Sequence, residues 1–258
     1  MSFRTLRRRI LPALLALAFL APQAQAQNVG VQLSLLIDVS GSVDGTEFLL
    51  QRNGYVTAFQ SAAIQNAIVN AGGIAVNLVY WSSLAVQSVG WTHITNAAQA
   101  NAFAAAIFAT TRPTTGTVGT QTAIGTAIDF GVSTFGNAFG GDAFTATRRV
   151  LDVSGDGASN SGGSETTARN TAVAAGYIIN GIAIGDAFLL TYYQNNVIGG
   201  TGSFALLANS FDDFESAIED KLFREITGDV VPEPATMVLL ATGLLGMGAV
   251  QYRRRRKV

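Results

Sequence analysis

The chain has 258 residues, of which 48% are apolar and 13% are charged, and it contains one histidine and no cysteine. This composition is typical of a folding chain rather than a disordered one, and it excludes disulfides, cysteine-ligated metals and histidine-rich zinc sites. Nine of the 16 basic residues lie near the two ends, so residues 27–230 hold seven basic and 16 acidic side chains, a net charge of −9. An acidic body of this kind lacks the basic surface that nucleic acid requires, and it suits a cation.

Residues 1–26 have the pattern of a secretory signal peptide. A basic segment at residues 4–9 precedes twelve apolar or small residues at 10–21, and Ala24 and Ala26 supply the small side chains that signal peptidase accepts. An uncleaved anchor helix is the alternative, although twelve such residues are few for a membrane span. We expect signal peptidase to process this chain and the remainder to leave the cytoplasm.

The middle of the chain alternates apolar runs, which predict strands, with segments of helical spacing. The predicted strands cover residues 31–39, 74–80, 85–89 near an edge, 148–153, 177–184 and, more weakly, 200–208. The predicted helices cover residues 44–68, 95–109, 122–135, 164–175 and 212–226, with a loop over 112–119. This alternation predicts one α/β domain over residues 27–230: a three-layer, doubly wound, mostly parallel sheet with helices on both faces.

The C-terminal segment combines three elements in a fixed order. Pro232, Glu233 and Pro234 are followed by a mainly apolar stretch over residues 235–252 and then by five basic residues. The apolar stretch is long enough to cross a bilayer if flanking residues reach the interface, and the basic run would keep the chain end in the cytoplasm.

This order of elements resembles the PEP-CTERM sorting signal of Gram-negative bacteria. The resemblance implies that residues 231–258 are a sorting signal, that the chain is held transiently in the inner membrane, and that the membrane protease exosortase removes the helix. A plain single-pass anchor is the alternative. In either case the body faces away from the cytoplasm, in the cell envelope, at the cell surface or outside the cell.

Three polar segments follow predicted strands or the predicted loop. Asp38, Ser40 and Ser42 form an Asp-x-Ser-x-Ser pattern after the first strand, Thr120 begins a Thr-x-Thr-Ala segment after the loop, and Asp156 follows the fourth strand. Because the carboxyl ends of parallel strands meet at one edge of a sheet, we expect these segments to lie together. Helix caps alone are the alternative explanation for the first pattern.

Together the segments resemble the metal-ion-dependent adhesion site (MIDAS) of the von Willebrand factor type A (vWA) domain, and the resemblance extends over residues 29–228. It implies one Mg²⁺ or Mn²⁺ held by five residues: Asp38, Ser40, Ser42, Thr120 and Asp156. Gly155 departs from the family, which more often has threonine before this aspartate. The sequence of residues 151–160 resembles an exported bacterial branch of the family that has no assigned activity.

The chemistry of these side chains agrees with that implication. Mg²⁺ prefers six oxygen ligands at about 2.1 Å and usually keeps some waters. Hydroxyls and two carboxylates leave the ion short of full neutralisation and full coordination, and an acidic group on a protein or polysaccharide would complete both. The sequence therefore predicts modest metal binding, with ligand binding through the metal.

Asp152 falls inside an apolar strand, where a buried carboxylate is costly unless it is paired. One interpretation is that it orients Ser40, Ser42 or a metal-bound water. The other is that it accepts hydrogen bonds from loop amides or pairs with Arg148 or Arg149.

Three functions are compatible with these patterns. We favour an exported binding protein of the cell surface or matrix that is not an enzyme. The alternatives are a structural protein of an exopolysaccharide or biofilm matrix, in which the metal only stabilises loops, and a metal-dependent hydrolase. His93 is the single histidine, and the chain has no Gly-x-Ser-x-Gly elbow, which disfavours a Ser-His-Asp hydrolase.

Overall fold

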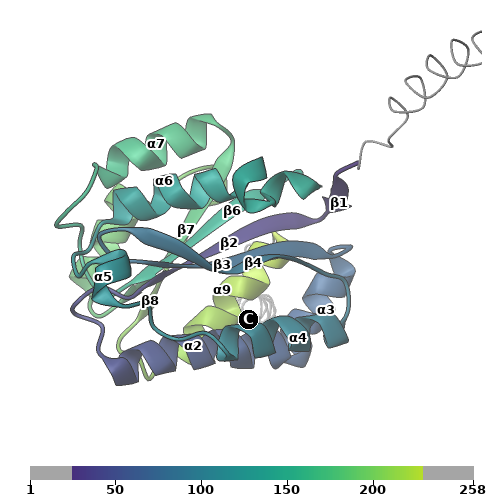
Figure 1. Cartoon of the computed structure of the whole chain (residues 1–258), viewed down its shortest axis with the longest axis horizontal. Coiled ribbons are helices and arrows are strands. Elements are labelled where there is room, and N and C mark those ends of the chain that lie inside the picture. The colour runs from purple at the N-terminus through teal and green to yellow at the C-terminus, as the bar shows by residue number, and fades with distance from the viewer. Residues whose placement is uncertain (1–24, 229–258) are drawn as a thin grey trace, which may run out of the picture.

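A computed structural model of the chain describes residues 25–228, and its centre is a six-stranded sheet (Figure 1). The strands are β2 (Val31–Asp38), β3 (Ile74–Trp81), β4 (Ala85–Ile94), β6 (Arg149–Gly155), β7 (Tyr177–Ile184) and β8 (Ala205–Ala208). Their order is β4-β3-β2-β6-β7-β8, with β4 antiparallel to β3 and the other neighbours parallel. The predicted α/β fold with a mostly parallel sheet is confirmed.

Helices cover both faces of this sheet. The longer ones are α2 (Gly45–Gln60), α3 (Ala62–Asn70), α4 (Ala97–Phe108), α6 (Ile124–Thr134), α7 (Glu165–Ala174) and α9 (Phe214–Thr227). Figure 1 shows α2, α3, α4 and α9 on one face and α6 and α7 on the other, and each layer has its own apolar core. The three-layer arrangement predicted from the sequence is therefore present.

Strand β2 shows how the two cores form. All eight of its residues are buried, and successive side chains point to opposite faces. Leu35 packs in the core that contains Tyr55 and Leu222, whereas Leu36 packs in the core that contains Ile128. A continuous apolar run is what a strand covered on both sides needs, and the same alternation decides which way the polar residues of the sheet point.

The single helix predicted over residues 44–68 is wrong in one respect, because the structure has two helices divided at Ser61. The backbone of Ser61 is extended, and its amide donates to the Ala58 carbonyl oxygen at the end of α2. Its hydroxyl accepts a hydrogen bond from the Ile64 amide at 3.2 Å and caps α3. The apolar spacing continues through this serine, so periodicity alone does not reveal the break.

Several short elements are not indicated by the sequence patterns. They are β1 (Gln27–Val29), β5 (Phe144–Ala146), α5 (Thr115–Val118), α8 (Ala187–Tyr192), the 3₁₀ turns η1 (Asn137–Phe139) and η2 (Gly141–Ala143), and the π-helical turn η3 (Tyr193–Val197). The strand predicted over 85–89 extends to Ile94, and the one predicted over 200–208 begins only at Ala205. Gly200 and Gly202, with φ angles of 95° and 78°, turn the chain before it.

The predicted signal peptide, apart from its last two residues, and the predicted sorting segment lie outside the described residues. Over residues 25–228, no helix is both long and apolar enough to cross a membrane.

The partners expected for Asp152 are wrong. Asp152 lies beside Leu35 in the sheet and points to the layer of α2 and α9, whereas Asp38 shares the alternation of Leu36 and points to the other face. The Asp152 carboxylate pairs with Lys221 Nζ at 2.5 Å and accepts a hydrogen bond from the Tyr55 hydroxyl at 3.2 Å. Its contacts are therefore made across the core to α9 and α2, in place of the site hydroxyls or the neighbouring arginines.

Lys221 lies between two buried acids. Its Nζ is 2.5 Å from Asp152 Oδ1 and 2.5 Å from Glu225 Oε1, and all three side chains are fully buried. Asn180 of β7 donates a further hydrogen bond to Glu225 Oε1 at 3.0 Å. Burial raises the pKa of Glu225 to about 7, while the ammonium of Lys221 acts in the opposite direction. This polar network joins α9 to the central strands.

We expect Lys221→Met to lower the free energy of unfolding by about 3 kcal/mol, because it leaves two carboxylates buried without a cation. Urea denaturation monitored by circular dichroism measures the change. Arg224→Met is the matched control on the same helix, since Arg224 pairs with the partly exposed Asp220, and it should cost less than about 1 kcal/mol. Equal losses for the two variants would contradict the role given to the buried network.

Candidate metal site

The three predicted polar segments meet at one edge of the sheet. The first follows β2, the second lies between α5 and α6, and the third follows β6, which is the parallel neighbour of β2. The amide of Gly41 in the first segment donates to the Thr120 carbonyl oxygen in the second at 2.8 Å. Ser42 Oγ of the first segment donates to Asp156 Oδ1 of the third at 2.7 Å. The expectation that these segments lie together therefore agrees with the structure.

A continuous chain of short contacts connects four of the five predicted residues. The Ser40 amide donates to Asp38 Oδ1 at 2.7 Å, and the hydroxyls of Ser40 and Ser42 lie 3.2 Å apart. The bond from Ser42 to Asp156 completes the chain. Asp38 and Ser40 are fully buried, Asp156 is partly buried and Ser42 is exposed, so the cluster runs from the sheet edge out to the surface.

The helix that follows the first segment does not use these serines as caps. Asp44 is the N-cap of α2, and its carboxylate accepts hydrogen bonds from the amides of Thr46 and Glu47. The Glu47 carboxylate in turn accepts a hydrogen bond from the Asp44 amide, which completes a capping box. The alternative that Asp-x-Ser-x-Ser is only a helix cap is not supported, because the cap lies two residues beyond Ser42.

Neighbouring side chains hold the first segment in place. Gln51 of α2 is buried and donates to the Asp38 carbonyl oxygen at 3.1 Å. Arg112 donates to the carbonyl oxygens of Val39 and Ser40 at 3.0 and 2.9 Å. These bonds end on backbone oxygens, so they fix the path of the segment without using its side-chain oxygens.

The second and third segments are tied together by one asparagine. Asn160 accepts a hydrogen bond from the Thr122 amide through its side chain, and its own amide donates to the Thr122 carbonyl oxygen. The hydroxyl of Ser82, at the end of β3, donates to the Gln121 carbonyl oxygen at 2.9 Å. The three loops therefore form one cross-linked rim.

The predicted threonine is only partly accounted for. Thr120 is exposed and contacts the first segment through its carbonyl oxygen, which accepts a hydrogen bond from the Gly41 amide. Thr122, two residues on, is buried, and its hydroxyl lies 3.4 Å from Ser40 Oγ. Thr122 is a second threonine beside the candidate site, and the repeated threonine of Thr-x-Thr-Ala is the sequence signal that could have indicated it.

Asp38 is an unusual carboxylate. Its pKa is raised from the ordinary 3.8 to about 7: burial is the largest cause, repulsion from Asp156 adds to it, and hydrogen bonds from the amides of Ser40 and Asp156 act in the opposite direction. Its Oδ2 atom is buried and has no hydrogen-bond partner among the described residues. Of the ion pairs in residues 25–228, none includes Asp38. The Asp38 carboxylate therefore has no positively charged partner within the described residues.

A small divalent cation fits this donor set. Asp38 Oδ2, Asp156 and the hydroxyls of Ser40 and Ser42 are hard oxygen donors, which Mg²⁺ and Mn²⁺ accept. Gly155 keeps Asp38 Oδ2 uncovered, since a Cβ atom there would lie 2.8 Å from it. In the described part of the chain, no group of three or more His, Cys, Asp or Glu side chains is suited to hold a metal ion. A metal held here would therefore depend on the hydroxyls.

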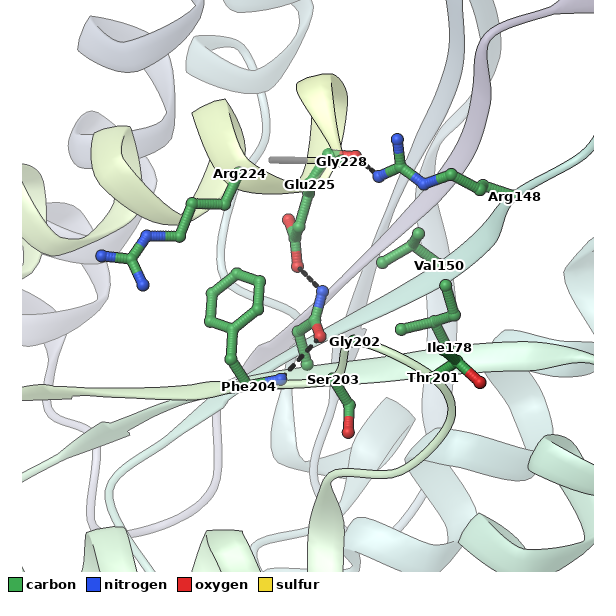
Figure 2. Close-up of a pocket in the computed structure, with 11 residues that line it drawn as sticks. Arg148, Val150, Ile178, Thr201, Gly202, Ser203, Phe204, Arg224, Glu225 and Gly228 are labelled. Atoms are coloured by element: carbon green, nitrogen blue, oxygen red, sulfur yellow. Dashed lines mark hydrogen bonds between the residues drawn. The ribbon is translucent and has the colours of Figure 1, made fainter. Parts of the chain in front are cut away.

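A separate small pocket lies between α9 and the amino ends of β6 and β7, away from the three polar segments (Figure 2). It measures about 240 Å³ and has Val150 and Ile178 on one wall and Glu225 of α9 on the other. Glu225 accepts the hydrogen bond from Asn180, which also lines the pocket. Arg148, at its rim, donates to carbonyl oxygens at the C-terminal end of α9. Its polar groups belong to the buried network around Lys221 or to the C-terminal end of α9. We therefore assign the candidate metal site to the edge of the sheet where Asp38 and Asp156 lie.

The single histidine lies away from the metal site. His93 is on β4 beside Ala75, near the amino end of β3, and its ring packs against Phe144. It therefore provides no general base for the cluster around Asp38.

Comparisons with known proteins agree with this fold. Residues 28–230 match the family described as "Protein of unknown function (DUF1194)", and residues 230–256 match the PEP-CTERM protein-sorting motif. The fold is that of a protein of the vWA type. The chain belongs to the DUF1194 family, and no curated protein is significantly similar to it.

Solved structures with this fold include three kinds of protein. Proximal thread matrix protein 1 from the mussel byssus has a TM-score of 0.59 at 18% identity, and the match covers 80% of this chain and 49% of that one. The pilus adhesin SpaC from Lactobacillus rhamnosus GG has a TM-score of 0.53 at 17% identity, covering 79% and 30%. A von Willebrand factor type A protein from Catenulispora acidiphila has a TM-score of 0.52 at 14% identity, covering 78% and 43%.

These similarities establish the fold, and the chain spans about half the length of the mussel protein and less of the other two. Another structure of the mussel protein, with a TM-score of 0.55 at 18% identity, covers 80% of this chain and 47% of that one and has a zinc-occupied MIDAS motif.

The raised pKa of Asp38 predicts that the free energy of unfolding of the metal-free protein falls as pH rises. Between about pH 4 and pH 7 the folded chain keeps a proton on Asp38 that the unfolded chain has lost, so this carboxylate lowers stability progressively as pH rises through that window. We expect Asp38→Asn in EDTA to be no more stable than wild type near pH 4. Above pH 7 it should be more stable by up to about 3 kcal/mol.

Urea denaturation of both proteins across that pH range measures the effect. Because groups distant from Asp38 titrate equally in the two proteins, their difference reports on Asp38 together with its repulsion from Asp156. A difference that stays constant with pH would contradict this account of the site.

Proposed function

We propose that this protein is an exported binding protein that recognises an acidic ligand through a divalent metal ion. Asp38, Ser40, Ser42, Thr120 and Asp156 hold one Mg²⁺ or Mn²⁺, to which Thr122 contributes a further hydroxyl nearby. The ion supplies positive charge and open coordination positions when it is bound. The three loops around the ion contact the rest of the ligand.

The observation that carries this proposal is the buried carboxylate of Asp38, which has no cationic partner among the described residues. It accepts a hydrogen bond from the Ser40 amide, and the Ser40 hydroxyl is linked through the Ser42 hydroxyl to Asp156. Two carboxylates at most neutralise a divalent ion, and hydroxyls add no charge. A carboxylate on a protein or polysaccharide is therefore attracted to the bound ion, although the body of the chain is acidic.

The names of the structural relatives support a role in binding or in a matrix. One relative is a thread matrix protein with a zinc-occupied MIDAS motif in one of its structures, and another is a pilus adhesin. Their chains are longer than this one, so any common activity concerns this domain alone. None of these names is that of an enzyme, and the site lacks a histidine base, so we propose that the protein is not a hydrolase.

The C-terminal motif supports export to the cell envelope or surface. A PEP-CTERM motif implies processing by exosortase, after signal peptidase has removed residues 1–26. We propose that the vWA domain over residues 27–230 is the mature part and that residues 231–258 anchor it only until they are cleaved. The alternative matrix function, in which the metal only stabilises loops, has support from the mussel relative.

Retention on immobilised alginate, which is rich in carboxylates, and on neutral dextran tests the proposal. We expect residues 27–230, the part proposed to be mature, to bind alginate in Mg²⁺ or Mn²⁺ and to elute with EDTA, with no retention on dextran. Without metal, a domain of net charge −9 is repelled by an anionic matrix, so simple ion exchange does not mimic the result.

Asp156→Ala should reduce retention at least about tenfold, because it removes one of the metal's two charged ligands. Asp129→Ala, an exposed change of equal charge on α6, is the matched control and should bind as wild type does. Metal that raises the melting temperature without retention on alginate would favour the matrix function. Retention that persists in EDTA would contradict a role for metal.

A further inference from the structure

Two further polar atoms are buried on the α6 and α7 face of the sheet, near Asp38. The hydroxyl of Tyr193 and Nε1 of Trp81 are buried and, like Asp38 Oδ2, have no hydrogen-bond partner among the described residues. Trp81 lies directly beside Asp38 in the sheet. A buried polar atom without a partner costs about 1–3 kcal/mol, so two such atoms close to the candidate site require an explanation.

The Tyr193 hydroxyl and Asp38 Oδ2 both lie close to Gly155. A Cβ atom at residue 155 would lie 2.8 Å from each of them. Since real Cβ atoms do not approach other atoms that closely, a side chain here would displace the tyrosine, the aspartate or both. Gly155 therefore leaves the two oxygens facing the same small space.

A second glycine lets the tyrosine reach this space. A Cβ atom at Gly181 of β7 would lie 2.7 Å from Cδ1 of the Tyr193 ring, so the ring packs directly on the strand backbone. Tyr193 also starts the π-helical turn η3, and such turns often occur at functional sites. Its ring is fully buried, which fixes the hydroxyl near Asp38.

We propose that Tyr193 is a positioning residue of the metal site, whose hydroxyl orients the Asp38 carboxylate for the ion. With the ion bound, the phenol donates to Oδ2 a hydrogen bond that the structure itself does not contain, and it holds the ionised carboxylate in the orientation that the ion requires. This inference rests on the proposed function, because it concerns how the same site holds its metal.

A positioning role and a purely structural role predict opposite effects of Tyr193→Phe. The substitution keeps the ring that packs on Gly181 and removes only the hydroxyl. If the hydroxyl serves metal binding, Mg²⁺ affinity should fall about tenfold, as is common when a residue that orients a metal ligand is changed. The metal-free protein should melt at the same or a higher temperature, because an unpaired buried hydroxyl has been removed.

The experiment is calorimetric titration of the full chain with Mg²⁺ and, separately, with Mn²⁺, together with thermal melts in EDTA. Tyr177→Phe, at the start of β7 away from the site, is the matched control and should bind Mg²⁺ as wild type does. A near-ultraviolet difference spectrum gives a second readout: Mg²⁺ should perturb tyrosine absorption in wild type and in Tyr177→Phe, and the perturbation should be lost in Tyr193→Phe.

The outcomes separate the two proposals. Wild-type protein that binds no Mg²⁺ or Mn²⁺ overturns the proposed function and the role of Tyr193 together. Metal binding by wild type with unchanged affinity in Tyr193→Phe overturns the role of Tyr193 alone. Reduced metal-free stability of Tyr193→Phe with unchanged affinity assigns the hydroxyl a structural role instead.

Discussion

Asp38 is a fully buried carboxylate, and no cationic side chain of the described residues pairs with it. Taking a charge out of water costs several kcal/mol unless it is paired, so the folded chain must either keep a proton on Asp38 or bind a positive charge from outside. The raised pKa of Asp38 describes the first response. The oxygen-rich surroundings of Ser40, Ser42 and Asp156 provide for the second.

Asp152 shows the contrast within the same sheet. It is as deeply buried as Asp38 and lies on the adjacent strand β6, but it points to the opposite face and has Lys221 against it. The chain thus neutralises Asp152 with its own lysine, whereas Asp38 has no cation among the described residues, which is the basis of the proposed metal site. Because side chains alternate along a strand, Asp152 and Asp38 point to opposite faces of the sheet. Lys221 of α9 therefore neutralises Asp152 without reaching the candidate metal site around Asp38.

Much of this arrangement could be predicted from local sequence. Continuous apolar runs such as residues 31–39 predict the buried strands, and the rule that polar loops meet at the carboxyl edge brought Asp38, Ser40, Ser42 and Asp156 together. These features depend on residues near one another in the chain or on a general property of parallel sheets.

The features that escaped prediction depend on contacts between distant residues. The pairing of Asp152 with Lys221 joins residues 69 positions apart, and no pattern in either segment indicates it. The approach of Tyr193 to Asp38 depends on two glycines in other strands. The helix break at Ser61 is local, but the apolar spacing that continues through it hides the cap.

An anomalous difference map from crystals soaked in Mn²⁺ would show directly whether the residues around Asp38 hold a divalent metal ion. We expect one strong peak at the sheet edge, in contact with the side chains of Ser40, Ser42 and Asp156. No peak there would contradict it. So would a peak found only at the acidic segment before and within α9, because the buried carboxylate of Asp38 would then have no metal partner.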